Sequence, residues 1–261
     1  MIAAALSVVL AASDAGIETF VDAKAAFARV LEVKPAVLAV GEYHEIEGAP
    51  KVKSAVKRFT LELLPSLKGR AGSLVLETWM TTGKCGEVEK QATKAVQETT
   101  KRPATTEDEL TTLLGKAYDL GLANHILLMS CDEYKSMLGD DGELDGEKSL
   151  TLVRHKLEDK ALEVKEKGEW PLVIYGGALH NDLSPAEGFE AVTFGPSLMR
   201  ETKGSYVELD LLVPEYVEGD DDLKKEPWFA EALKLSAKGK TVLVTTGPSS
   251  RVLMFSRTRR R

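Results

Sequence analysis

The chain has 261 residues, of which 43% are hydrophobic and 29% are charged, a composition typical of a globular protein with one large core. Its formal net charge of −7 excludes the basic surface that binds a nucleic-acid backbone, so we expect no nucleic-acid partner. The basic run at 257–261 is short and terminal, and we interpret it as a solvated chain end.

The first fifteen residues carry most of the pattern of a secretory signal peptide. Residues 2–12 form an uncharged apolar run that is too short to span a bilayer, and small residues follow at 13–15. The usual basic residues before the run are missing, so an apolar first helix packed on the domain is the alternative. We predict a signal peptide at 1–15, one domain at 16–261 and no other membrane segment. The predicted location is periplasmic or secreted, with a cytoplasmic location as the alternative.

The first elements after this segment predict a βαβ unit. Apolar residues at helical spacing over 18–33 indicate an amphipathic helix, and the short apolar run 36–40 indicates a strand buried on both faces. A helix over 52–67 and a second buried strand over 73–76 follow. A strand, a helix and a strand at this interval are typical of parallel pairing with a right-handed crossover.

The alternation of helices and strands continues to the end of the chain. It predicts an α/β fold with a mainly parallel sheet, covered by helices on both faces and closed by a C-terminal β-hairpin. Polar and apolar residues alternate over 206–212, which indicates a more exposed strand. The other predicted elements are helices over 106–121, 150–164 and 227–235, strands over 125–129, 172–175 and 206–212, and a hairpin over 240–245 and 251–256.

The two cysteines both lie near one rim of the predicted sheet. Cys85 follows one predicted strand, and Cys131 comes at the end of another. A disulfide between them is geometrically feasible and would suit an exported protein, whereas two unrelated thiols are the alternative. No Cys-x-x-Cys motif is present to indicate a zinc or thioredoxin-like site.

Two predicted buried strands are each followed by a Gly-x-x-His motif, at 41–44 and at 177–180. In parallel sheets, ligands bind at the rim formed by the carboxyl ends of the strands. We expect each glycine to permit a sharp turn there and each histidine to project over the rim. One glutamate lies inside the first motif, and another ends the strand over 73–76. The predicted site therefore consists of Glu42, His44, Glu77 and His180.

Two imidazoles and two carboxylates support two kinds of chemistry. They could bind a divalent metal ion, or they could form a metal-free acid–base set in which a carboxylate orients a histidine. Asp132 and Asp182 follow strands at the same rim and are candidates to orient an imidazole. His125 starts its strand and so faces the opposite rim, and His155 lies on a charged helix; we interpret both as non-catalytic.

Short motifs of this kind also occur as purely structural features, since a strand-end glycine often only turns the chain. The repetition of the motif, with Glu77 between the two copies, favours the functional interpretation. No Gly-x-Ser-x-Gly elbow, P-loop or Gly-x-Gly-x-x-Gly sequence is present. Trp79 and Tyr175 are expected either to line a pocket or to pack in the core.

The order of these motifs resembles the ChaN-like, erythromycin-esterase-like and Tiki/TraB superfamily. The resemblance covers residues 36–182, rests on the same four site residues, and extends to Arg154 on the helix before the last motif. It implies an α/β domain with a shared polar site. Within that group it implies metal-dependent proteolysis for Tiki-like members, macrolactone opening for erythromycin-esterase-like members, and haem binding in iron uptake for ChaN-like members. The lipoprotein cysteine of ChaN-like members and further family histidines have no counterpart here.

Three functions fit this sequence. The first, which we favour, is a hydrolase of ester or amide bonds in a small-molecule or peptide substrate. In it, His44 would be a general base or metal ligand with Glu42 as its partner, while Glu77 and His180 would complete a metal site or stabilise developing charge. The second is a haem- or metal-binding protein of iron uptake, with Tyr43, His44 or His180 as an axial ligand. The third is a degenerate, non-catalytic interaction domain.

Overall fold

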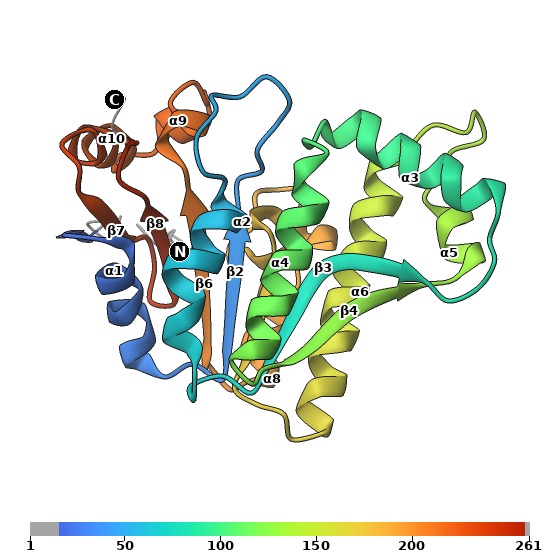
Figure 1. Cartoon of the computed structure of the whole chain (residues 1–261), viewed down its shortest axis with the longest axis horizontal. Helices are drawn as coiled ribbons and strands as arrows, with labels where there is room; N and C mark the ends of the chain where they lie inside the picture. Colours follow the sequence, from blue (N-terminus) through green and yellow to red (C-terminus); the bar gives the residue numbers. More distant parts are fainter. Residues whose placement is uncertain (1–15, 259–261) are drawn as a thin grey trace, which may run out of the picture.

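The computed structural model describes residues 16–258, so the predicted signal peptide at 1–15 lies outside the described residues. One eight-stranded sheet crosses this part of the chain in the order β1-β7-β8-β6-β2-β5-β3-β4 (Figure 1). Every neighbouring pair from β8 to β4 is parallel, whereas β7 runs antiparallel to both β1 and β8. The predicted α/β fold, its mainly parallel sheet and its C-terminal hairpin of β7 and β8 are confirmed.

The elements alternate along the chain as the sequence predicts. The strands are β1 (Gly16–Phe20), β2 (Val37–Glu42), β3 (Ser73–Thr81), β4 (Ala123–Met129), β5 (Leu172–Gly177), β6 (Tyr206–Leu212), β7 (Thr241–Thr245) and β8 (Ser250–Met254). The α-helices are α1 (Ala23–Val30), α2 (Ala55–Arg58), α3 (Glu87–Thr100), α4 (Thr105–Asp119), α5 (Cys131–Ser136), α6 (Gly146–Glu166), α7 (Ala178–Asn181), α8 (Gly195–Glu201), α9 (Pro214–Val217) and α10 (Phe229–Ala237). Helix α2 continues as π- and 3-10-helix to Leu67. No helix within residues 16–258 is long and apolar enough to cross a membrane.

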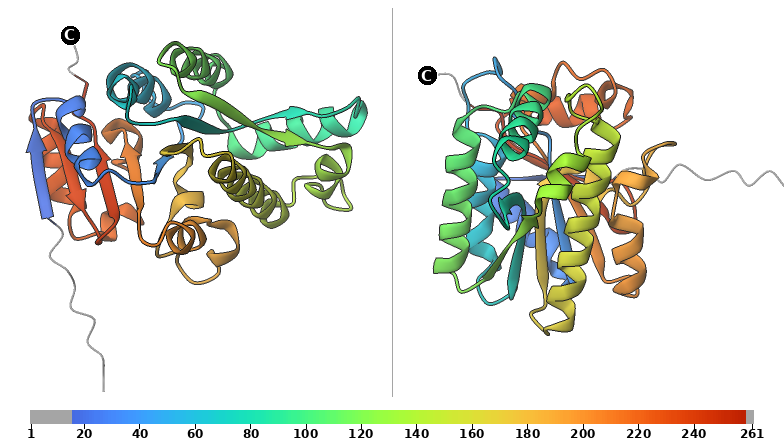
Figure 2. Two further views of the ribbon diagram at one scale, coloured as in Figure 1. Left: turned by 90° about the horizontal axis from the view of Figure 1, so that it is seen from below. Right: turned by 90° about the vertical axis from the view of Figure 1, so that its right-hand side faces the viewer.

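Helices cover both faces of the sheet (Figure 2). One face packs on α1, α2 and α4, and the other packs on α6, α8 and α10. On β2, Leu38 and Val40 pack on the face of the sheet covered by α1, α2 and α4, whereas Val37 and Ala39 pack on the opposite face. Because successive side chains of a strand point to opposite faces, a strand buried on both faces is an unbroken apolar run in the sequence.

The predicted helix over 18–33 is wrong at its start. Gly16–Phe20 form the edge strand β1, which pairs with β7, and α1 begins only at Ala23. Asp22 caps that helix by accepting a hydrogen bond from the Ala25 N–H at 2.8 Å. Phe20 falls in helical phase with the apolar residues of α1, which explains the error. This segment is a strand because it pairs with the edge of β7, which lies about 220 residues later in the chain.

The prediction of a more exposed strand over 206–212 is also wrong. Strand β6 lies between β8 and β2 in the middle of the sheet, and nearly all of its residues are buried. Its polar residues Glu208 and Asp210 face a cavity on the side of α8 and α10 rather than bulk water. The alternation of polar and apolar residues therefore marks an internal polar cavity.

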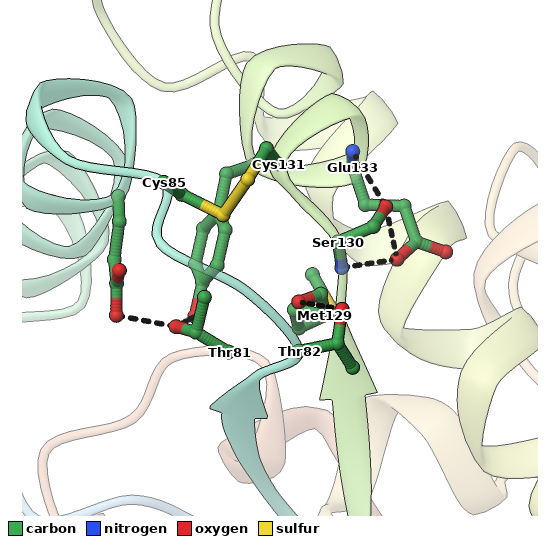
Figure 3. The surroundings of a disulfide bond; sticks show 9 residues. Thr81, Thr82, Cys85, Met129, Ser130, Cys131 and Glu133 are labelled. Carbon is green, nitrogen blue, oxygen red and sulfur yellow. Dashed lines mark hydrogen bonds between the residues drawn. A yellow bond between two sulfur atoms is a disulfide. The ribbon is translucent and has the colours of Figure 1, made fainter.

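Cys85 and Cys131 form a disulfide, with 5.0 Å between their Cα atoms (Figure 3). The bond joins the segment after β3 to the first residue of α5, beyond the long pair of strands β3 and β4 that extends toward α3 (Figure 1). Disulfides persist mainly in oxidising compartments, and the periplasmic or secreted location stays a prediction.

Replacing both cysteines by serine should lower the free energy of unfolding by about 4 kcal/mol, the loop-closure entropy of a cross-link between residues 46 apart in sequence. Denaturant unfolding of the double variant measures the loss, and the wild-type protein in reductant should show the same loss. A loss below about 1 kcal/mol in both samples would show that the cross-link does not stabilise the fold.

Candidate functional site

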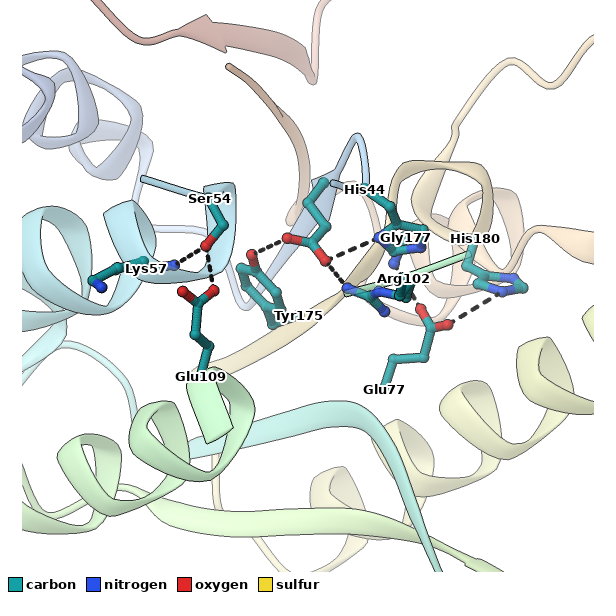
Figure 4. Close-up of polar contacts among 10 residues, drawn as sticks. His44, Ser54, Lys57, Glu77, Arg102, Glu109, Tyr175, Gly177 and His180 are labelled. Carbon is teal, nitrogen blue, oxygen red and sulfur yellow. Dashed lines mark hydrogen bonds and ion pairs between the residues drawn. The ribbon is translucent and has the colours of Figure 1, made fainter. Parts of the chain in front are cut away.

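The four predicted site residues lie on or directly after three adjacent strands, β2, β5 and β3, and Figure 4 shows His44, Glu77 and His180 among them. Glu42 is the last residue of β2, and His44 follows two residues later. Glu77 lies in β3, directly after the last residue pair of β3 with β5. His180 belongs to α7, the single helical turn that follows β5. The parallel topology thus brings together residues that are up to 138 positions apart in sequence.

Glu42 and His44 form a carboxylate–imidazole pair. His44 Nδ1 lies 2.9 Å from Glu42 Oε1. An ionised carboxylate can only accept hydrogen bonds, so Nδ1 carries the proton and the lone pair of the neutral ring is on Nε2. The side chain of Glu42 is 3% exposed and that of His44 is 31% exposed. The pair therefore combines a buried anchor with an imidazole that solvent and ligands can reach.

Three neighbours hold Glu42 in its ionised form. Tyr175 donates its hydroxyl to Oε2 at 2.7 Å, and Arg102 Nη2 donates to Oε1, the atom that also accepts from His44. Burial alone would raise the pKa of Glu42, but the hydrogen bond from His44 and the charge of Arg102 outweigh it and lower the pKa to about 2. Glu42 is consequently an anion throughout the physiological pH range.

Glu77 and His180 form a second, looser pair that is anchored to the backbone. His180 Nδ1 donates to the carbonyl oxygen of Val192 at 2.7 Å, and its Nε2 lies 3.9 Å from Glu77 Oε1. The other oxygen of Glu77, Oε2, accepts the Gly177 N–H at 2.6 Å. His180 is only 3% exposed. This pair is therefore held beneath the surface, and it fixes the chain that lies against His44.

The two glycines that end β5 serve close packing rather than the sharp turn that we predicted. Gly177 has a φ of −71°, which any residue adopts. A Cβ built on Gly177 would lie 2.9 Å from His44 Nε2, and one on Gly176 would overlap the carboxylate of Glu77. The absence of both side chains therefore leaves room for His44 and Glu77 to lie close together against this segment.

Gly177→Ala should therefore displace the His44 ring, because the added methyl group fits only if that ring moves, and should lower the free energy of unfolding by about 1 kcal/mol. Gly115→Ala in α4 is the matched control: a Cβ there meets nothing within 4 Å, and it should raise stability by up to about 1 kcal/mol. Urea unfolding compares the two variants. Equal stability of Gly177→Ala and the wild type would show that the close approach is not a constraint.

Two residues that contact Glu42 were not predicted as site residues. Arg102 lies in the short connection between α3 and α4, and its buried Nε has no hydrogen-bond partner among the described residues. In the sequence it is one of two adjacent cations, and nothing distinguishes it from Lys101. Tyr175 ends the apolar run of β5, and its pairing with Val40 directs its hydroxyl toward Glu42. It is fully buried and serves as a hydrogen-bond donor rather than as a pocket wall.

The three residues predicted to support the site lie around its edge. Arg154 donates to the Thr193 carbonyl oxygen at 3.1 Å and so steadies the segment that accepts from His180. Asp132 is exposed in the first turn of α5, and the Asp182 carboxylate turns back to accept the Ser184 N–H at 2.7 Å. No hydrogen bond joins either described aspartate to an imidazole. The orienting role that we predicted for them is taken by Glu42 and by a backbone carbonyl.

An open cavity of about 450 Å³ begins at His44. Tyr43 and Tyr216 line it on one side, and residues 46–50 line it on the other. Its volume lies in the range of small-molecule sites. The accessible imidazole therefore faces a space that a substrate of modest size can enter.

The donor atoms of the site do not fit a divalent metal ion in this arrangement. Both oxygens of Glu42 accept hydrogen bonds, one oxygen of Glu77 accepts a backbone N–H, and the Arg102 guanidinium lies where a second cation would be repelled. Within residues 16–258, no three His, Cys, Asp or Glu side chains are arranged to hold a metal ion. The predicted ligands thus form two separate pairs rather than one convergent donor set.

Haem, the alternative cofactor, fits these residues no better. His180 is buried and directs Nε2 toward a carboxylate, and Tyr43 lines a cavity whose other charged groups are all acidic. Acidic walls repel the two propionates of haem. Two of the three predicted axial ligands, Tyr43 and His180, therefore lack the surroundings that haem requires.

No protein-family model matches the chain, and comparison with curated proteins and with solved structures gives no significant match. The resemblance to the ChaN-like, erythromycin-esterase-like and Tiki/TraB superfamily consequently rests on the motifs alone and stays a prediction. Inferences about function have to come from the chemistry of the site.

Proposed function

We propose that the protein is a hydrolase of ester or amide bonds in which His44 acts as the general base. The observation that carries the proposal is the Glu42–His44 pair, in which an ionised carboxylate accepts from Nδ1 and the His44 side chain is 31% exposed. A carboxylate that orients a histidine in this way is a recurrent arrangement for proton transfer in acyl-transfer enzymes.

In the proposed reaction, a substrate carbonyl enters the cavity beside His44 and a water molecule lies against Nε2. The imidazole takes a proton from the water as its oxygen attacks the carbonyl carbon, and Glu42 stabilises the imidazolium ion that forms. The proton then passes from Nε2 to the leaving alcohol or amine as the bond to the carbonyl carbon breaks. Water is the nucleophile because no serine, threonine or cysteine contacts His44 in the described hydrogen-bond network.

Arg102 supplies the positive charge that this reaction needs. A tetrahedral intermediate carries a negative oxygen, and Arg102, which Glu42 holds in place but which is not among the residues lining the cavity, would stabilise that charge through the field of its guanidinium. Glu77 and His180 are positioning residues in this scheme. They hold the Gly177 segment against which His44 lies, and neither is among the residues that line the cavity at His44.

The proposal is tested with p-nitrophenyl acetate and p-nitrophenyl butyrate as ester probes and with the matching p-nitroanilides as amide probes. The wild type, after dialysis against chelator, should release p-nitrophenol faster than buffer does and faster than His44→Gln does. His155→Gln, which alters an exposed histidine on α6, is the matched control and should keep the wild-type rate. Equal rates for the wild type and His44→Gln on all four probes would refute the proposal, and activity that vanishes with chelator would show that a metal is required.

A further inference from the structure

A cavity of about 360 Å³ lies at the amino ends of β2 and β5, at the opposite end of these strands from His44 (Figure 1). Leu38 and Val173 line it from the sheet. Leu31 and Leu67 line it from the helical segments that pack on the same face of the sheet. Its volume lies in the range of small-molecule sites. It shares no lining residue with the cavity at His44, so the two spaces are separate.

The lining of this cavity is apolar except for two cations, Lys34 and Arg70. No acidic residue and no residue with a hydroxyl group lines it. Neither cation has an ion-pair partner within residues 16–258, and the acidic residue nearest to Lys34 in sequence, Glu32, pairs with Arg29 instead. The cavity therefore combines apolar surface with positive charge that no described carboxylate neutralises.

This positive charge stands out because the protein as a whole is acidic, with a formal net charge of −7. The cavity that β6 faces has the opposite character, since its charged residues are all carboxylates: Asp182, Glu208, Asp210 and Glu226. An organic anion is repelled there and attracted to the pair of cations at the amino ends of the strands. The distribution of charge thus selects the sign of a ligand for this cavity.

The donors available in the cavity fit a carboxylate. The backbone N–H groups of Lys34 and Arg70 already donate to the carbonyl oxygens of Leu31 and Leu67, at 3.2 and 2.8 Å. Phosphate sites use free backbone N–H groups, and these two are taken. The side chains that remain are a guanidinium fork, which matches the two oxygens of a carboxylate, and an ammonium point charge.

We infer that this cavity binds an organic carboxylate, an anionic head carried on an apolar body of small-molecule size. Arg70 would hold the two carboxylate oxygens, Lys34 would add a second positive charge, and the leucine and proline side chains of the lining would cover the body. The inference does not depend on the proposed hydrolysis, because it requires only binding, at the other end of the sheet from His44.

The test uses two probes of nearly the same shape: 4-phenylbutyrate, which is an anion at neutral pH, and 4-phenylbutan-1-ol, which is uncharged. Titration calorimetry should give the carboxylate a Kd at least about fivefold below that of the alcohol, the effect of a partly exposed ion pair. Arg70→Gln should reduce this preference, and the double variant Lys34→Asn/Arg70→Gln should abolish it.

The variants are chosen to keep the fold. Lys34 has a φ of 49°, a left-handed conformation that asparagine tolerates, and the Arg70 side chain is exposed. Lys101→Asn is the matched control, because Lys101 is exposed, has the same φ of 49° and lies outside the cavity. It should bind both probes as the wild type does.

Amide ¹H–¹⁵N NMR during the same titrations gives the place of binding, and the largest shifts should fall on lining residues such as Ala71 and Val173. Equal affinity of the wild type for the two probes would overturn the inference. An unchanged preference in the folded double variant, or shifts confined to other parts of the protein, would also overturn it. None of these results bears on the hydrolysis assay, which uses uncharged probes and the His44 variant.

Discussion

Replacing His44 by glutamine should lower kcat/KM for the best hydrolysed probe by on the order of 10³-fold, the usual contribution of a general base. Glutamine is of similar size and remains polar, so the fold should be retained, but it cannot take a proton from water at neutral pH. Steady-state kinetics with unfolding curves on the same samples measure the effect. His155→Gln provides the baseline for replacing an exposed histidine.

Glu42→Gln should cause a loss of similar size, since it removes the charge that stabilises the imidazolium ion and presents an amide N–H to Nδ1. The double variant should be no slower than the slower single variant, because the two residues act as one unit. Glu187→Gln, which alters an exposed carboxylate that does not line the cavity at His44, should retain activity. Multiplicative losses in the double variant would mean that the two residues act independently.

The second large effect concerns stability at acid pH. The pKa of Glu42 is lowered from 4.5 to about 2 in the folded protein. A carboxyl group with a lowered folded-state pKa stabilises the fold above its unfolded pKa, and this contribution disappears as pH falls through the folded pKa. Glu42 should therefore contribute about 3 kcal/mol at neutral pH, lost between about pH 4.5 and pH 2.

Chemical unfolding of the wild type and Glu42→Gln across this window measures the contribution as a difference between the two proteins. The difference should be largest above pH 5 and should shrink toward pH 2. Glu208 acts in the opposite direction: its pKa is raised from 4.5 to about 7, so the stability that its protonated form contributes is lost as pH rises between these two values. Because both proteins contain Glu208, its effect cancels. A difference that is independent of pH would mean that Glu42 is not held as a buried anion.

The sequence predicts the fold well wherever burial alone decides the structure. The apolar runs that became β2, β3 and β5 have no other stable environment than a sheet covered on both faces. The prediction fails where the structure of a segment depends on a partner that is distant in sequence. Gly16–Phe20 is a strand because the edge of β7 is open, and β6 carries Glu208 and Asp210 because a cavity lies above them. Neither the open edge of β7 nor the cavity can be predicted from the residues of the segment itself.

The same division applies to the candidate site. Glu42, His44, Glu77 and His180 could be located because the carboxyl ends of parallel strands must meet at one rim. Arg102 could not be located in this way, because its contact with Glu42 depends on the path of the connection between α3 and α4. The local sequence does contain it, but as one cation in a polar segment. Locating Arg102 required the tertiary structure.

The most direct test of the account is the protonation of the His44 ring, observed by ¹H–¹⁵N NMR through the two-bond couplings of the imidazole at a pH where the ring is neutral. The proton should be on Nδ1 in the wild type and should leave that nitrogen in Glu42→Gln. A wild-type ring protonated on Nε2, or a ring that does not respond to Glu42→Gln, would contradict the claim that Glu42 holds His44 as a base.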